Sequence, residues 1–193
     1  MGNHRRIKNS KQNQMTDEML MMAVKNGRLE HASELFNRYH KPLYNFFVKI
    51  TFDRDLAHDL TQNVFLRMIK YKASYKEDKV FKPWIYQLAR NIYADHYRKN
   101  KVLFSDYTEV EDLKAKVAAV DEAMVNDEKQ KLLYISLFKL TKEQREILIL
   151  TRFHQMKYEE VATVLDCSVA NVKVKVYRAM QQLRKKFLEL EKV

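Results

Sequence analysis

The chain has very little of the residues that make tight turns. Its 193 residues include two glycines, Gly2 and Gly27, and two prolines, Pro42 and Pro83. An antiparallel β fold needs turn residues every 8 to 12 positions, roughly, so this composition excludes one. Long stretches rich in Leu, Lys, Glu, Gln, Met and Ala favour helices instead. The sequence therefore predicts an all-α protein.

Cysteine and long apolar runs are equally scarce. Cys167 is the single cysteine, which excludes an intrachain disulfide and a metal site built on paired cysteines. No run approaches the ~18 apolar residues of a membrane span. Residues 1–14 are polar and basic and contain no apolar stretch of signal-peptide length. We therefore expect a cytoplasmic protein without direct membrane insertion.

The residue patterns of an enzyme are also missing. Asp55 and Asp59 lie one helical turn apart, but on a face expected to be exposed. There is no glycine-rich phosphate loop. The histidines are scattered without the spacing of metal ligands. We predict no catalytic activity, no metal and no cofactor.

The chain carries a large excess of positive charge. The formal net charge is +11, which favours a polyanionic partner, either nucleic acid or an anionic membrane. Charge alone does not choose between these partners, because a basic helical face is often only a solvated one.

Helical periodicity divides the first half of the chain. Thr16, followed by two acids, predicts an N-capped helix, Pro42 should bend or break the second helix, and Pro83 is expected to start the fourth. The predicted segments are a tail at 1–14, a short helix from Thr16, helices over 29–50 and 53–70, and a loop at 71–82.

Residues 105–130 differ from the rest of the chain in charge. Eight acidic side chains stand against three lysines there, a local charge of −5. This composition predicts an acidic linker between two small helical domains. The predicted organisation is a flexible basic tail at 1–14, a first domain at 15–103, the linker at 104–130 and a second domain at 131–193.

The second domain ends in a helix-turn-helix pattern. A helix is predicted over 131–140, and Thr141 and Gln144 form a capping box for the next, which reaches about Phe153. A short helix over 158–165 and a long one from Ser168 to about 190 follow. Asp166 stands in the tight turn between them, where a left-handed backbone is often needed and aspartate tolerates it.

The outward face of that last helix carries only basic and neutral side chains between 169 and 186. Ser168, Asn171 and Lys173 could reach base edges in the major groove, whereas Lys175 and Arg178 would meet phosphates. The competing interpretation is a helical hairpin with a basic solvated face. The predicted DNA contacts are Ser168, Asn171, Lys173, Lys175, Tyr177 and Arg178.

Three blocks of the sequence, in the order given below, resemble bacterial sigma factors of the sigma-70 family. The resemblance is in particular to the small extracytoplasmic-function (ECF) group. The block Asp59-Leu-Thr-Gln-Asn-Val-Phe-Leu66 is similar to the polymerase-docking helix of their region 2. The block Pro83-Trp-Ile-Tyr-Gln-Leu-Ala-Arg-Asn91 and its continuation to Lys99 are similar to their promoter-reading helix. Residues 140–184 resemble their region 4.

The resemblance implies how each block works. The first domain would grip the clamp helices of the largest polymerase subunit, and the second would meet the flap of the second largest. Asn63 departs from the glutamate that is common in the family. The implied polymerase contacts are Asp55, Asp59, Leu60, Gln62, Asn63, Phe65 and Arg67; a solvated helix face is the other interpretation of this polar row.

The resemblance also implies that the first domain holds the melted −10 element, with one unstacked base in a pocket. We expect Asn91 and the 75–81 loop to form it, and Trp84 and Tyr93 to belong to the core. The implied −10 contacts are Tyr75, Phe81, Arg90, Asn91, Asp95, Arg98 and Lys99. The last helix would read the −35 element.

The expected function is therefore to bring core polymerase to promoter DNA and start transcription. The linker would thread into the polymerase near the RNA path or serve as a solubilising spacer. The family implies an anti-sigma factor, often membrane-anchored, as a further partner. The alternative is a helix-turn-helix regulator that binds two-fold DNA sites as a dimer, without acting as a polymerase subunit. That alternative explains the second domain but leaves the two blocks of the first domain unexplained.

Overall fold

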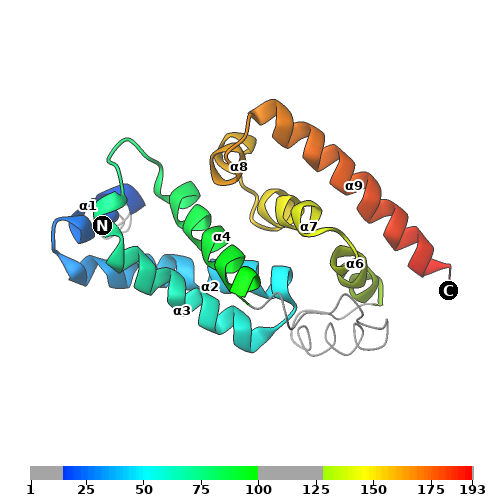
Figure 1. Ribbon diagram of the computed structural model, residues 1–193, viewed down its shortest axis with the longest axis horizontal. Coiled ribbons are helices and arrows are strands. Elements are labelled where there is room, and N and C mark those ends of the chain that lie inside the picture. The colour runs from blue at the N-terminus through cyan, green and yellow to red at the C-terminus, as the bar shows by residue number, and fades with distance from the viewer. Residues whose placement is uncertain (1–14, 100–127, 193) are drawn as a thin grey trace, which may run out of the picture.

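The computed structural model describes residues 15–99 and 128–192, and the regular elements in these ranges are all helical (Figure 1). The first bundle comprises α1 (Asp17–Lys25), the 3₁₀ turn η1 (Leu29–His31), α2 (Ala32–Thr51), α3 (Arg54–Lys70), the 3₁₀ turn η2 (Lys72–Ser74) and α4 (Phe81–Lys99). The second comprises α6 (Glu128–Phe138), α7 (Lys142–Leu148), the π-helical turn η3 (Ile149–Phe153), α8 (Tyr158–Leu165) and α9 (Val169–Glu191). The predicted all-α class is confirmed.

Side-chain caps start the helices of the first bundle where the sequence predicts them. The Thr16 hydroxyl accepts the Met19 N–H at 3.2 Å, and the Asp53 carboxylate accepts the Leu56 N–H at 2.9 Å. Each cap satisfies a backbone donor that has no partner within its helix. Between α2 and α3 the chain turns at Phe52, which adopts a left-handed φ of 55° and is 3% exposed.

Pro42 lies inside α2, which continues without a break for 20 residues. The proline removes one helical hydrogen bond and crowds the preceding turn, at a cost of about 3 kcal/mol. Tyr39 and Leu43 beside it, and Phe46 and Phe47 one turn further on, are buried in the core. Burying several such side chains, at about 1.5–3 kcal/mol each, outweighs that cost. The predicted break is therefore wrong.

Helix α4 begins at Phe81, two residues before the predicted start at Pro83. The reason is a cap from a distant part of the chain. The Phe81 N–H donates to the Glu18 carboxylate of α1 at 3.0 Å. The carboxylate also stands at the positive end of the α4 dipole. Pro83 is then inside the first turn, where its missing N–H leaves no bond unmade.

The second bundle follows the predicted signals closely. Thr141 and Gln144 form the reciprocal capping box at the start of α7. The turn between α8 and α9 has Asp166 in the left-handed conformation, with φ 51°, and the Ser168 hydroxyl caps α9. The helix predicted over 131–140 instead spans Glu128–Phe138, so the last three residues assigned to the linker belong to α6. The remainder of the linker and the 1–14 tail lie outside the described residues.

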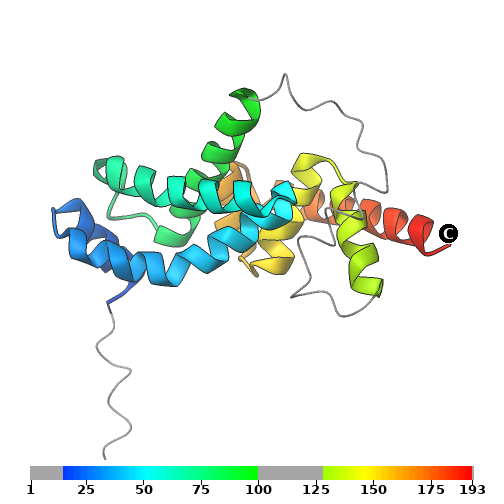
Figure 2. The ribbon, with the colours of Figure 1, turned by 90° about the horizontal axis from the view of Figure 1, so that it is seen from below.

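The two bundles pack against each other, with α4 along α8 and α2 against α7 and η3 (Figures 1 and 2). Arg90 Nε of α4 lies 3.1 Å from the Glu146 carboxylate of α7. The Tyr86 hydroxyl is 2.8 Å from His154 Nδ1, and Arg145 donates to the Ile50 carbonyl at 3.0 Å. The buried apolar residues of both bundles form one continuous core.

Candidate nucleic-acid and polymerase interfaces

Helix α9 presents a basic outer face that is free of acids over most of its length. Val172, Val176 and Ala179 are buried against the rest of the bundle. This burial turns the opposite side of the helix outward, and every predicted −35 residue is exposed: Ser168, Asn171, Lys173, Lys175, Tyr177 and Arg178. Tyr177 is 66% exposed, so its ring and hydroxyl are accessible to a partner. The face therefore has the exposure, charge and side-chain lengths that a DNA groove requires.

Ser168 has a structural part on this face as well. Its hydroxyl accepts the Asn171 N–H at 3.2 Å and so fixes the start of α9. Val174, 47% exposed, stands between Lys173 and Lys175 and was not among the predicted contacts. An apolar side chain at this place could contact the methyl group of a thymine. The sequence indicates this exposure, because Val174 falls outside the three-and-four spacing of the buried residues Val172, Val176 and Ala179.

The outer face of α3 carries a row of polar side chains, which we call the docking ridge: Asp55, Asp59, Gln62, Asn63 and Arg67. The first three are exposed, and the last two are half-buried. Asp53 and Asp59 are both exposed, but the Asp53 carboxylate has a structural task because it caps α3. The ridge can therefore meet a partner without a change in the fold.

Two of the predicted polymerase contacts lie beneath the ridge rather than on it. Leu60 is 3% exposed and Phe65 is 7% exposed, so both belong to the core. The Phe65 ring centre lies 4.8 Å from that of Phe36, which is 43% exposed. Leu66, absent from the predicted set, is 68% exposed beside the ridge. The prediction is corrected accordingly: Leu66 and Phe36 provide the accessible apolar surface there.

Tyr75 and Phe81 were predicted to meet an unstacked base, and this assignment is wrong for both. Each is 0% exposed. Their rings pack edge-to-face at 6.1 Å, and Trp84 lies 5.1 Å from Tyr75. The Tyr75 hydroxyl donates to the Lys79 carbonyl at 2.6 Å, which holds the 75–80 loop against the bundle. These aromatics shape the loop from inside and cannot stack on a base.

Asn91, Asp95 and Arg98 lie together on a cavity of about 480 Å³ on the outer side of α4. Trp84 and Gln87 from the same helix also line it. Asn91 is exposed and presents both a donor and an acceptor. A polar pocket with one aromatic wall suits an unstacked base, which is held by edge hydrogen bonds and by stacking.

An ion-pair network fixes one wall of this cavity. Arg67 of the docking ridge donates to Asp95 Oδ2 at 2.9 Å, and Arg98 donates to Asp95 Oδ1 at 2.7 Å. The hydrogen bond from Arg67 lowers the pKa of Asp95 below its ordinary value. Asp95 thus remains ionised and orients two guanidinium groups beside the cavity. The network also connects the ridge with the pocket.

Arg90 lies apart from the other predicted −10 residues. Its guanidinium faces the second bundle and pairs with Glu146, whose side chain is 5% exposed. Burial raises the pKa of Glu146, and the charge of Arg90 opposes that shift. Lys99, at the end of α4, is exposed. In this arrangement Arg90 serves the interface between the bundles, and Lys99 remains accessible.

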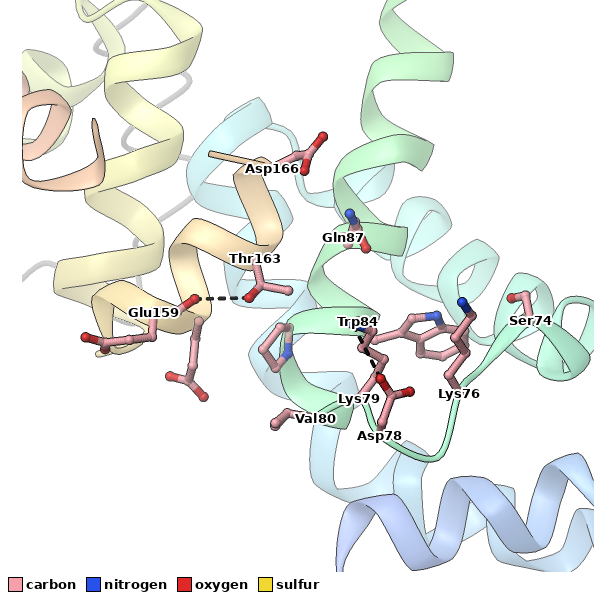
Figure 3. Close-up of a pocket in the computed structure, with 12 residues that line it drawn as sticks. Ser74, Lys76, Asp78, Lys79, Val80, Trp84, Gln87, Glu159, Thr163 and Asp166 are labelled. Carbon is pink, nitrogen blue, oxygen red and sulfur yellow. Dashed lines mark hydrogen bonds and ion pairs between the residues drawn. The ribbon is translucent and has the colours of Figure 1, made fainter. Parts of the chain in front are cut away.

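A second cavity, of about 670 Å³, lies between the 74–80 loop and α8. Lys76 and Lys79 line it from the loop, and Glu159 and Asp166 line it from α8. In Figure 3, Asp166 projects from α8 on the side that faces Gln87 of α4. A DNA backbone that approached the loop lysines would meet the carboxylates of α8 in this cavity.

Sequence reasoning missed the pocket residues Trp84 and Gln87. The signal was present, because Gln87, Asn91 and Asp95 recur every four positions and so share one face of α4. Arg67 was assigned to polymerase binding alone, because only the packing of α3 on α4 places it at the pocket.

Other kinds of site are not supported in the described part of the chain. Residues 15–99 and 128–192 contain no group of three His, Cys, Asp or Glu side chains that could hold a metal ion. Within the same ranges, no helix has both the length and the apolar character needed to cross a membrane.

Comparisons with known proteins agree with this geometry. The family model described as Sigma-70 region 2 matches residues 35–102, and that described as Sigma-70, region 4 matches residues 137–183. The first match contains the docking ridge and the α4 pocket, and the second contains the helix-turn-helix. The two matches account for both bundles, whereas a helix-turn-helix regulator would account for only one.

Relatives named as ECF RNA polymerase sigma factors cover most of the chain. The ECF RNA polymerase sigma factor SigM of Bacillus subtilis is 33% identical over 153 residues, which is 78% of this chain and 91% of SigM. The ECF RNA polymerase sigma-E factor of Escherichia coli K12 is 22% identical over 182 residues, covering 90% of this chain and 95% of the relative.

Two solved structures share the fold. CnrH in complex with the cytosolic domain of CnrY has a TM-score of 0.67 at 22% identity, covering 88% of this chain and 95% of CnrH. The sigma factor RpoE, in complex with the anti-sigma factor NepR from Bartonella quintana, has a TM-score of 0.65 at 20% identity, covering 80% and 94%. Taken with the two region matches and the relationship to SigM, these findings place the chain in a family: it is an ECF sigma factor of the sigma-70 family, which directs RNA polymerase core to promoters and initiates transcription there.

Proposed function

We propose that three separate surfaces divide the work of this sigma factor. The docking ridge of α3, with Leu66 and Phe36, binds the clamp helices of the largest polymerase subunit, and the second bundle binds the flap. The α4 pocket around Asn91 takes an unstacked base of the −10 element. The outer face of α9 reads the −35 element. Catalysis of RNA synthesis belongs to the polymerase.

The observation that carries this proposal is the separation of the exposed surfaces by charge. Asp55 and Asp59 give the docking ridge two carboxylates on an exposed face of α3. The outer face of α9 has lysines and arginines at equivalent exposure, without an acid before Glu189. Phosphates would repel the first surface and attract the second. The acidic surface therefore suits a protein partner and the basic surface suits DNA.

The domain division at 15–103 and 131–193, with the linker between, belongs to the same proposal. The −35 and −10 elements are numbered by their positions on the promoter and are therefore ~25 base pairs apart. This spacing corresponds to about 85 Å of B-DNA at ~3.4 Å per base pair. In this structure the two bundles are in contact, which we call the closed arrangement. Helix α8, which precedes α9 in the helix-turn-helix, packs directly on α4. Binding both elements at once therefore requires the bundles to separate. Separation also frees Arg90 and removes the carboxylates of α8 from the 74–80 loop.

A protein that keeps the bundles together would hold the sigma factor inactive. CnrH and RpoE, which share this fold, were solved with CnrY and with the anti-sigma factor NepR, respectively. We propose that an anti-sigma factor likewise binds this chain, in the cytoplasm where the polymerase is. It would cover the docking ridge, the DNA surfaces, or both.

The direct test uses the purified chain and bacterial core RNA polymerase. We expect stable association in a pull-down and promoter-specific transcripts in run-off assays on genomic fragments. The transcript ends would give the −35 and −10 sequences. Direct binding of a dimer to a palindromic site, without association with polymerase, would contradict the proposal.

Asp59→Ala should weaken binding to core polymerase about tenfold, equivalent to about 1.4 kcal/mol. Because Asp59 is exposed, the free energy of unfolding should change by less than about 0.5 kcal/mol. Glu77→Ala removes an exposed acid outside the ridge and serves as the control. Binding is measured by titration of labelled core, and stability by urea unfolding. Unfolding of the Asp59→Ala variant would contradict the assignment of Asp59 to the polymerase interface.

Lys173→Ala should weaken binding of the holoenzyme to its own promoter by about 1–3 kcal/mol if the lysine contacts a base. Lys185→Ala, which alters an exposed lysine three turns further along α9, is the matched control. Both variants are compared on the cognate promoter and on one with a scrambled −35 element. An equal loss on both DNAs would assign Lys173 to a phosphate instead.

A further inference from the structure

Arg67 of the docking ridge reaches across to the neighbouring helix. Helix α3 packs along α4, and the Arg67 guanidinium donates to Asp95 Oδ2 of α4 at 2.9 Å. The Arg67 side chain is 29% exposed, whereas Asp55 and Asp59 on the same ridge are exposed. Arg67 also lines the cavity around Asn91. The backbone of Arg67 therefore belongs to the ridge, but its guanidinium lies at the α4 pocket.

Asp95 connects Arg67 with a second arginine, Arg98. Its Oδ1 accepts from Arg98 Nη2 at 2.7 Å, while its Oδ2 accepts from Arg67. The Arg98 side chain is 76% exposed. An exposed ion pair three positions apart on a helix is weak by itself, because holding a long side chain in one geometry costs entropy. Arg67 holds the carboxylate from the α3 side, so Asp95 already has a fixed orientation where it meets Arg98.

The Asp95 carboxylate itself does not suit a DNA strand. Its charge would repel phosphates, and both of its oxygens already accept hydrogen bonds from arginines. The two guanidinium groups, by contrast, exceed the charge of the single carboxylate between them. A guanidinium has five N–H donors, and Arg98 uses its Nη2 for Asp95. Arg98 therefore keeps donors for a phosphate, which guanidinium groups bind with two parallel hydrogen bonds.

We propose that Arg67 is a positioning residue for the melted −10 strand. Through Asp95 it holds the Arg98 guanidinium beside the α4 pocket, where Arg98 binds the phosphate next to the captured base. Order that exists before binding reduces the conformational entropy that Arg98 loses when the strand arrives. Asp95 has the same positioning task and does not contact the strand. This role rests on the proposed function of the pocket and adds to it a contact with the strand backbone.

A double-mutant cycle in the holoenzyme tests this role. The DNA is a fragment of the chain's own promoter whose −10 element is left single-stranded. Arg98→Ala should weaken binding of this DNA about tenfold, as expected for loss of a charge-assisted hydrogen bond. Arg67→Gln should weaken it about threefold to tenfold, because Arg98 is no longer held. In the Arg98→Ala background, Arg67→Gln should change binding by less than about twofold, since no guanidinium is left to position.

Two further measurements separate positioning from a general structural effect. Loss of one phosphate contact should reduce the slope of log K against log salt concentration by about 0.7 in either single variant. Binding of Arg67→Gln to core polymerase should stay within about twofold of the wild type, because the guanidinium faces the pocket. Lys41→Gln removes an exposed cation of α2 and should alter neither DNA binding nor the slope.

Asp95→Asn breaks the same connection without a change in α3, so it also serves if Arg67→Gln is unstable. By charge alone, removal of a carboxylate should strengthen DNA binding. Loss of the hold on Arg98 should weaken it instead, and we expect binding of the single-stranded −10 DNA to fall about threefold or more. The sign of the change therefore distinguishes positioning from net charge.

Three results would overturn the proposal. Additive losses in the double variant would show that Arg67 contacts the strand itself. Loss of core binding without loss of DNA binding by Arg67→Gln would assign its guanidinium to the polymerase. Tighter DNA binding by Asp95→Asn would show that its charge matters and its hold on Arg98 does not. Failure of the pocket itself is distinguished by the wild type, whose holoenzyme would then bind single-stranded and duplex −10 DNA equally.

Discussion

Arg145→Ala should lower the free energy of unfolding by about 3–4 kcal/mol. The Arg145 guanidinium donates to the carbonyls of Leu137 and Leu140 at 3.1 and 3.2 Å, to that of Phe138, and across the interface to that of Ile50 at 3.0 Å. Truncation leaves these acceptors without their charged donor.

The reason for so large an effect is that Arg145 caps two helices at once. Leu137 and Phe138 end α6, and Ile50 lies in the last turn of α2. The final carbonyls of a helix have no partner within it, and the negative end of the helix dipole favours a cation. The guanidinium also stacks over the rings of Phe52 and Phe138, with its carbon 5.4 and 4.8 Å from their centres.

Urea unfolding followed by circular dichroism measures this loss. Arg152→Ala removes an exposed arginine of η3, close in the sequence, and should change the free energy of unfolding by less than about 0.5 kcal/mol. Arg145→Lys should recover only part of the stability, since one ammonium group cannot reach four carbonyls. A loss below about 1 kcal/mol for Arg145→Ala would show that water replaces the guanidinium.

Acidification from pH 7 to pH 4 should destabilise the wild type by about 3 kcal/mol more than it destabilises His154→Asn. Burial, aided by the charges of Lys49 and Lys82, lowers the pKa of His154 from 6.5 to about 4. The unfolded chain therefore binds a proton on this histidine below pH 6.5, whereas the folded chain does not until about pH 4. Stability is lost as the pH falls through this window, and above it the histidine has no effect.

The measurement compares urea unfolding of the two proteins at pH 7, 5.5 and 4. Other titrating groups contribute equally to both and cancel in the difference. The side-chain amide introduced by His154→Asn can replace Nδ1 as a partner of the Tyr86 hydroxyl, so the fold should survive. Parallel curves for wild type and His154→Asn would exclude a buried neutral imidazole.

The parts of the fold that could be predicted from the sequence depend on hydrogen bonds between near neighbours. Thr16, Asp53 and Ser168 cap helices by accepting an N–H three residues ahead. The left-handed turn at Asp166 follows from one residue and its position between two apolar patterns. Such contacts are local, so the order of residues contains nearly all the information that fixes them.

The parts that could not be predicted depend on contacts between distant segments. Tyr75 looks accessible in a lysine-rich loop, but Lys25 of α1 donates to its carbonyl at 2.6 Å and Trp84 packs on its ring. The start of α4 depends on Glu18, 63 positions before Phe81. For the candidate sites, helical spacing could predict the face of α9, whereas the partner of Arg90 is known only once α7 lies beside α4.

The shared cap at Arg145 and the continuous core also affect how the molecule melts. While the bundles remain together they should unfold in a single cooperative transition, because each completes hydrogen bonds of the other. On a promoter the two bundles would be apart. Breaking their contact costs free energy, which would reduce the net free energy of DNA binding. Tighter packing at this joint would therefore raise the melting temperature and weaken transcription together, a trade-off between stability and activity set by one interface.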